Sequence, residues 1–141
     1  MYDSIIPGGK YCIVNVGTGS YTGVGLVPPV NPPPPSPLKP IVRIFREAFT
    51  LEPKEGDKYI IAHKTFRMLV GHDDEGIVRL IPPGGKEVQW IIVDGYGPGR
   101  YRIKAVDSDK YWRMSREGEW GSVKLEEENG DSDQEWRFEE V

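Results

Sequence analysis

The sequence predicts an all-β protein built from twelve short strands in three units of four. A glycine-rich turn, a basic residue and the motif Tyr-x-Ile open each unit, at Tyr11, Tyr59 and Tyr101, with a period of about 45 residues. A second signature, an aromatic-x-apolar pair, closes each unit and begins at Phe49, Trp90 and Trp136. No window longer than about ten residues has a helical period, so long helices are not expected.

In both signatures the named residues alternate with a period of two, so each pair lies on one face of its strand. This alternation is typical of strands that turn one face toward a core. Two further strand-like runs lie between the signatures of each unit, and turn residues separate them. These runs are residues 20–26 and 41–45, residues 66–70 and 77–81, and residues 110–115 and 122–127. Each unit therefore contains four predicted strands.

This plan resembles the β-trefoil, in which six strands close a barrel and three hairpins cap it. Closure of the barrel removes exposed sheet edges. The resemblance covers the chain from Lys10 to Val141 and implies a single domain over residues 1–141. It also implies that the six repeated aromatic residues form the barrel core, where they specify the fold and not the function.

Composition and charge exclude several classes of partner. The chain has 141 residues, a formal net charge of -4 and a pI of about 5.3, which argues against a nucleic-acid partner. No stretch reaches membrane-spanning length and the first residues lack a signal-peptide pattern, so we expect no membrane partner and a cytoplasmic location. Cys12 alternates with Tyr11 and Ile13 in a strand and is interpreted as a packed, unreactive thiol.

The sequence offers little support for catalysis. His63 and His72 are the two histidines, and neither lies in a recognisable nucleophile motif. Three pairs of aspartates, which fall where hairpin turns belong and lack calcium-loop spacing, are 73/74, 107/109 and 131/133. We therefore expect no enzyme activity, no cofactor and no metal.

The segment from Gly25 to Pro40, GLVPPVNPPPPSPLKP, joins the predicted second and third strands of the first unit. Proline fixes φ and removes a backbone donor, so this segment is neither a helix nor a central strand. We expect it to be extended, stiff and exposed. Loops of this kind project from the barrel surface, where function usually lies.

The flanks of this segment resemble the fungal β-trefoil serine protease inhibitors of the cospin and cnispin group, which are related in fold to the mycocypins. The resemblance rests on Gly-Lys-Tyr-x-Ile-x-Asn-Val at residues 9–16, on GSYTGVGL after it, and on SPLKPIV at the loop exit. It implies a protease partner, of the serine class, bound by the loop between strands two and three. The family's anchor is basic, whereas residues 21–38 contain no Lys or Arg, and Lys39 precedes Pro40.

The remaining candidate anchor is Leu26, which would suit an apolar specificity pocket. The predicted protease-binding loop is then Gly25, Leu26, Val27, Pro28 and Pro29. A structural alternative is that the prolines only wrap the barrel. Two basic turn residues, Lys64 in AHKTF and Arg116 in SREGEW, are secondary candidates and are otherwise solvated turn residues.

The rival hypothesis is a carbohydrate-binding lectin with a glycan as partner. Gln134 to Phe138, QEWRF, matches the Gln-x-Trp pattern of ricin-type lectin repeats, but only this one unit carries it in register. Sugar stacking requires exposed aromatic rings, and the candidates are Tyr111, Trp112 and Trp120. Trp120 lies between two glycines in a predicted hairpin turn and should be the most exposed. A structural protein without a ligand is the third possibility.

Overall fold

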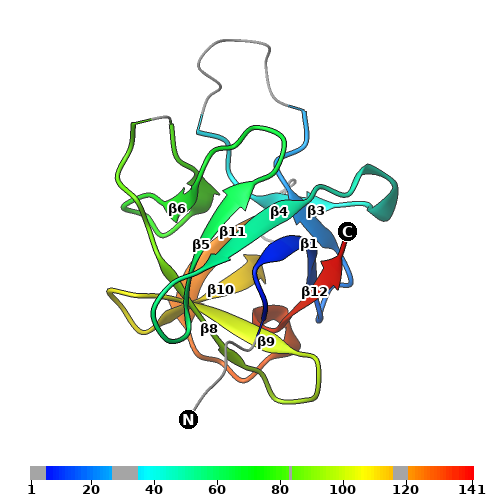
Figure 1. The fold of residues 1–141 in the computed structure, drawn as a ribbon. Coiled ribbons are helices and arrows are strands. Elements are labelled where there is room, and N and C mark those ends of the chain that lie inside the picture. Colours follow the sequence, from blue (N-terminus) through cyan, green and yellow to red (C-terminus); the bar gives the residue numbers. More distant parts are fainter. Residues whose placement is uncertain (1–5, 27–34, 83, 116–120) are drawn as a thin grey trace.

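The computed structural model describes residues 6–26, 35–82, 84–115 and 121–141 and contains twelve strands and two short 3-10 helices (Figure 1). No helix in these four ranges has the length and apolar character needed to cross a membrane. The helices are η1 (Arg43–Phe45) and η2 (Ser132–Gln134). The strands are β1 (Gly9–Asn15), β2 (Tyr21–Gly23), β3 (Lys39–Ile41), β4 (Phe49–Pro53), β5 (Lys58–His63), β6 (Val70–His72), β7 (Val78–Leu80), β8 (Trp90–Asp94), β9 (Tyr101–Ala105), β10 (Lys110–Ser115), β11 (Ser122–Glu127) and β12 (Trp136–Glu140).

Six of the strands close a barrel. Antiparallel pairing runs from β1 to β4, then through β5, β8, β9 and β12, and β12 pairs with β1 again. The other six strands form the hairpins β2–β3, β6–β7 and β10–β11. The prediction of an all-β protein with twelve strands and a closed six-stranded barrel is confirmed, and no barrel strand is left with an open edge.

The repeated aromatic residues lie in the core as predicted, with one exception. The buried residues are Tyr11, Phe49, Tyr59, Trp90 and Trp136. Tyr101 is only half-buried and packs against the outside of the buried cluster. Trp112 joins them, with its ring perpendicular to the rings of Trp90 and Trp136 at centroid distances of 5.2 and 5.7 Å. Edge-to-face rings of this kind add stability beyond burial alone.

The strand boundaries match the predictions best in the last unit. Predicted strands 110–115 and 122–127 are β10 and β11. In the first unit the predicted strand 41–45 is wrong beyond Ile41, because the backbone turns into η1 and exposes its side chains. The predicted strand 20–26 is shorter in the structure, where β2 spans Tyr21–Gly23. The predicted strand 66–70 overlaps β6 only at Val70, where β6 begins. The prediction that Cys12 is packed is confirmed, and burial raises the pKa of its thiol.

Candidate functional site

The proline-rich segment leaves the barrel beside the point at which it returns. β2 and β3 are paired through Tyr21 with Ile41 and Gly23 with Lys39, so the segment connects strands two and three as predicted. Val27, Pro28 and Pro29 fall in the range 27–34, outside the described residues. The described parts are therefore the two feet of the loop, residues 24–26 and 35–38.

The first foot is held by one carboxylate. The backbone N–H groups of Val24 and Gly25 donate to the two carboxylate oxygens of Glu47, each at 2.9 Å. The Val24 side chain is buried in the core, whereas Gly25 has a φ of +70°, in the left-handed region that favours glycine. The chain is thus turned sharply outward immediately before Leu26.

A buried histidine orients that carboxylate. His63 Nε2 lies 2.7 Å from Glu47 Oε1, and His63 Nδ1 accepts the backbone N–H groups of Thr65 and Phe66, both at 3.2 Å. Because Nδ1 accepts, the proton of the neutral ring is on Nε2, which donates to Glu47. The His63 side chain is 3% exposed and the Glu47 side chain 17%. A low-dielectric environment strengthens these bonds.

The pKa of Glu47 reflects the hydrogen bonds that its carboxylate accepts. Burial raises its pKa, but the hydrogen bonds from His63, Val24 and Gly25 together outweigh burial and hold it below the usual value of 4.5. The carboxylate is therefore charged at neutral pH and accepts three hydrogen bonds in one cluster.

The second foot is held by the buried side chain of Leu38 and by backbone hydrogen bonds. Leu38 lies in the segment predicted to be exposed, but its side chain is fully buried in the core, so the prediction of exposure is wrong there. Lys39 and Pro40, at the end of the same segment, already belong to β3. The Leu38 N–H donates to the Val78 carbonyl at 2.9 Å, and its carbonyl accepts the Val123 N–H at 3.1 Å. Ser36 accepts the Leu80 N–H at 2.9 Å, so the returning chain runs along β7. Both feet of the loop are therefore anchored in the barrel core through an apolar residue.

Leu26 projects from the first foot into solvent. Its side chain is 100% exposed, although Val24, two residues earlier, is buried. Single exposed leucines are common on protein surfaces, so exposure alone carries little weight. What distinguishes Leu26 is its place one residue beyond a backbone held by Glu47.

Of the three secondary candidates, Lys64, Arg116 and Trp120, only Lys64 lies among the described residues. Lys64 is exposed in the turn after β5, and its N–H donates to the Ala48 carbonyl at 3.0 Å. Arg116 and Trp120 lie in the range 116–120, outside the described residues, so the predicted exposure of Trp120 stays a prediction. Sequence reasoning missed Glu47, because its bonds to the loop span more than twenty positions and follow no local pattern.

Most residues that the glycan-binding hypothesis singles out contact other parts of the protein. Trp112 is fully buried, so its prediction as a sugar-stacking residue is wrong. The Tyr111 ring is covered by the Arg102 guanidinium, 5.1 Å from the ring centroid. The Gln134 side chain accepts the Asn129 N–H at 2.9 Å and donates to the Glu127 carbonyl at 2.8 Å. The one match to the Gln-x-Trp pattern thus ties together the turn before β12.

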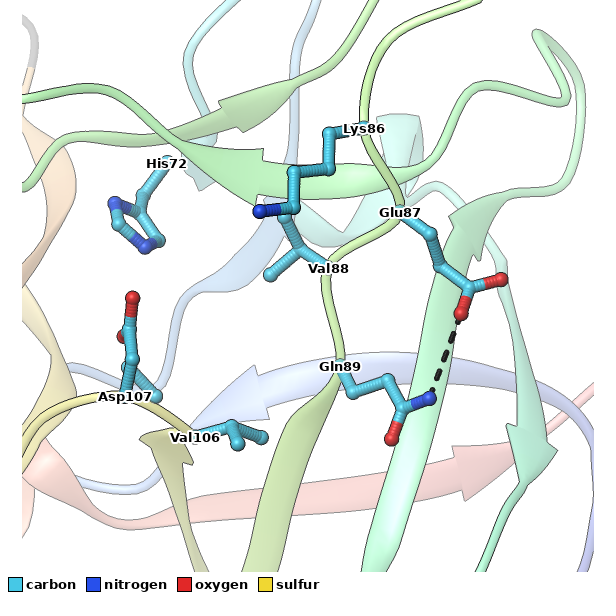
Figure 2. Close-up of a pocket in the computed structure, with 8 residues that line it drawn as sticks. His72, Lys86, Glu87, Val88, Gln89, Val106 and Asp107 are labelled. Carbon is cyan, nitrogen blue, oxygen red and sulfur yellow. Dashed lines mark hydrogen bonds between the residues drawn. The ribbon is translucent and has the colours of Figure 1, made fainter.

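A separate pocket of about 350 Å³ is lined by His72 at the end of β6, by residues 86–89 before β8 and by residues 105–107 at the end of β9. Figure 2 shows His72 and Asp107 pointing toward one another across this pocket, with the Lys86 ammonium group directed to the same side. Val88 and Val106 form part of its apolar wall. The pocket combines a donor, an acceptor and an apolar surface within a volume suited to a small molecule.

Neighbouring contacts fix the polar groups around this pocket. The His72 Nδ1–H donates to the Asp73 carbonyl at 3.0 Å, and the ring edge packs on Trp90, so Nε2 is left for another partner. Glu87 and Gln89 bond to one another at 3.4 Å and point away from His72 (Figure 2). Among the described residues no group of three or more His, Cys, Asp or Glu side chains could hold a metal ion.

Solved structures with the same fold include proteins of different function. A proteinase inhibitor from Coprinopsis cinerea has a TM-score of 0.78 and 14% identity, and the match covers 96% of this chain and 99% of that one. The Rhizoctonia solani agglutinin has a TM-score of 0.77 and 16% identity, with 99% and 100% covered. The BEL β-trefoil has a TM-score of 0.70 and 16% identity, with 99% and 97% covered. No protein-family model and no curated protein matches the sequence.

At these identities the likeness shows the β-trefoil fold alone. The neighbours include an inhibitor and an agglutinin, and both are covered almost completely by this chain. The fold therefore leaves inhibition and glycan binding open, and the choice between them depends on the surface groups of this chain.

Proposed function

We propose that the protein inhibits a protease, of the serine class, by presenting the proline-rich loop as a stiff extended segment with Leu26 as its anchor. The observation that carries the proposal is the double anchoring of the loop. Glu47 fixes the backbone at Gly25, buried Leu38 fixes the return, and Leu26 is fully exposed between them. The Coprinopsis cinerea inhibitor with the same fold supports the proposal without deciding it.

The physical argument concerns entropy. A protease binds its substrate as an extended strand, and a ligand that already has this shape loses little conformational freedom on binding. Prolines within the loop restrict φ, and the two feet restrict its ends. A leucine at the anchor position suits an apolar specificity pocket, as in chymotrypsin-like or subtilisin-like enzymes, better than the acidic pocket of a trypsin-like enzyme.

The test is a titration of the purified protein against chymotrypsin-like, subtilisin-like and trypsin-like serine proteases and a papain-like cysteine protease. We expect inhibition constants to be lowest for the first two, because their pockets accept leucine. The protein should also remain intact after long incubation at stoichiometric ratio, as measured by mass spectrometry. Rapid cleavage at Leu26 without inhibition would identify the loop as a substrate and overturn the proposal.

The pocket beside His72 favours a second candidate function, the binding of a glycan. Asp107 and His72 provide hydrogen-bonding groups for sugar hydroxyls, and Val88 and Val106 provide an apolar wall for the ring carbons. This chemistry needs no exposed tryptophan, and the agglutinin with the same fold supports it at the level of the fold. The partner would be a neutral sugar, because Lys86 and Asp107 contribute opposite charges.

A glycan array followed by calorimetry tests this candidate. We expect Asp107→Ala to weaken binding of any array hit by at least about tenfold, the scale of one lost charge-assisted hydrogen bond. The matched control is Asp109→Ala, since Asp109 is exposed in the same turn and pairs with Lys104 at 3.0 Å. An array without hits, or equal affinities for both variants, would exclude the pocket as a glycan site.

A further inference from the structure

A short turn next to the loop exposes three large apolar side chains. The turn, residues 42–46, comprises Val42, η1 and Arg46, and we call it the apolar–basic turn. Val42 is 63% exposed, Ile44 79% and Phe45 70%. Arg43 and Arg46 lie between and beside them and are also exposed. Three neighbouring apolar side chains on a surface, bordered by charges, are typical of a protein contact.

This turn is joined to the foot of the proline-rich loop. Glu47 follows Arg46 directly and holds the backbone of Val24 and Gly25. Ala48 then accepts the N–H of Lys64 from the turn after β5. Figure 1 shows the chain between β3 and β4 as a turn that projects beside β3, close to the strands that carry the loop. The apolar–basic turn and the Leu26 foot are thus linked through Glu47.

Cations accompany the turn and the loop foot, although the whole chain is acidic. The chain has a formal net charge of -4, yet Arg43 and Arg46 are exposed on the turn itself and Lys39 lies beside Gly25 in the loop foot. The Glu47 carboxylate is already bonded to His63 and to the loop backbone. Arg43, Ile44 and Arg46 also line a shallow hollow together with Glu139 and Glu140, and Glu139 accepts the Tyr21 hydroxyl there. The cations therefore favour a partner whose contact surface is acidic.

A standard protein–protein interface contains more residues than the predicted anchor segment of the loop. Specific protein–protein interfaces bury about 800 Å² on each partner, or some 20–30 residues per side. The predicted anchor segment, residues 25–29, has five residues, so further surface must contribute to an interface of this size. The apolar–basic turn has the exposed apolar groups and the position for that contact.

We propose that the apolar–basic turn is a second contact site for the protease bound by the Leu26 loop, and that it selects an enzyme with an apolar depression and an acidic rim beside its active-site cleft. The inference rests on the proposed inhibitory function. The turn is a 3-10 helix and not an extended strand, so it binds outside the cleft and is not itself read as substrate. Ile44 and Phe45 supply contact area, and Arg43 supplies charge complementarity.

The first experiment separates the contribution of the apolar contact area from the contribution of the Arg43 charge. We expect the double variant Ile44→Ala/Phe45→Ala to raise the inhibition constant about 10- to 100-fold, mainly through faster dissociation. Arg43→Glu should slow association at low salt, and the difference from wild type should shrink as salt is added. The matched controls are Tyr96→Ala and Lys110→Glu, which change an exposed aromatic and an exposed cation elsewhere on the barrel.

The outcomes distinguish the two proposals. Thermal unfolding of the Ile44→Ala/Phe45→Ala and Arg43→Glu variants should match wild type, because the altered side chains are exposed. If wild type inhibits and Leu26 variants lose inhibition while the Ile44→Ala/Phe45→Ala variant inhibits as wild type does, the second contact site is refuted and the inhibitory function stands. If wild type inhibits no serine protease, the proposed function fails first, and the second contact site fails with it.

Discussion

Replacing Leu26 by glycine is expected to weaken inhibition of a chymotrypsin-like or subtilisin-like protease by about 2–4 kcal/mol, or roughly 30- to 1000-fold. An anchor side chain that fills a desolvated pocket contributes on this scale, and removal of the whole side chain leaves the pocket empty. The fold should be unaffected, because the side chain is 100% exposed and makes no packing contact in the core. Inhibition constants and urea unfolding, measured on the same samples, separate the two effects.

The companion variant Leu26→Arg tests specificity. Arginine in place of leucine should move the preference toward trypsin-like enzymes, because the anchor residue dominates the fit to the specificity pocket. Equal inhibition constants for wild type, Leu26→Gly and Leu26→Arg would contradict the assignment of Leu26 as anchor. Any inhibition would then have to come from Lys64, Arg116 or another surface.

The barrel could be predicted from the sequence because its strands repeat a local pattern. Tyr59, Trp90 and Trp136 recur with alternating neighbours, and the structure buries all three. The short hairpin strands are harder to predict. The alternation at residues 41–45 predicts a strand, but within the described part of the chain no partner strand pairs beyond Ile41, and the backbone turns into η1. Tertiary context there overrides local propensity.

The site could be predicted only in part. The place of the proline-rich loop between strands two and three follows from counting strands, and the exposure of Leu26 agrees with the prediction of a projecting loop. The support of the loop could not be predicted, because the bond from Glu47 to Val24 joins residues far apart in the sequence. The burial of Trp112 could not be predicted, because an aromatic residue in a hairpin strand can face either the core or solvent, and here it fills the core.

Glu47→Ala is expected to destabilise the fold by about 2–4 kcal/mol and to weaken inhibition as well. The change removes the acceptor of three donors, namely His63 Nε2–H and the N–H groups of Val24 and Gly25. Each unsatisfied buried donor costs about 1–3 kcal/mol, and water entering at the exposed edge of Glu47 reduces the sum. The matched control is Glu139→Ala, which removes the acceptor of one hydrogen bond, from the Tyr21 hydroxyl, at an exposed position.

The same carboxylate gives the loop foot a defined pH dependence. Its pKa is lowered in the folded state, so its stabilisation is fully present above the usual value of 4.5 and is lost as pH falls through the lower folded value. Wild type should therefore be more stable to urea than Glu47→Gln at neutral pH, and the two curves should converge below that range. Slow hydrogen exchange at the Val24 and Gly25 amides should be lost over the same range in wild type and be weaker in Glu47→Gln at neutral pH, because glutamine keeps one acceptor oxygen of the two. A constant stability difference between the two proteins down to the lowest pH would show that the charge of Glu47 does not hold the loop.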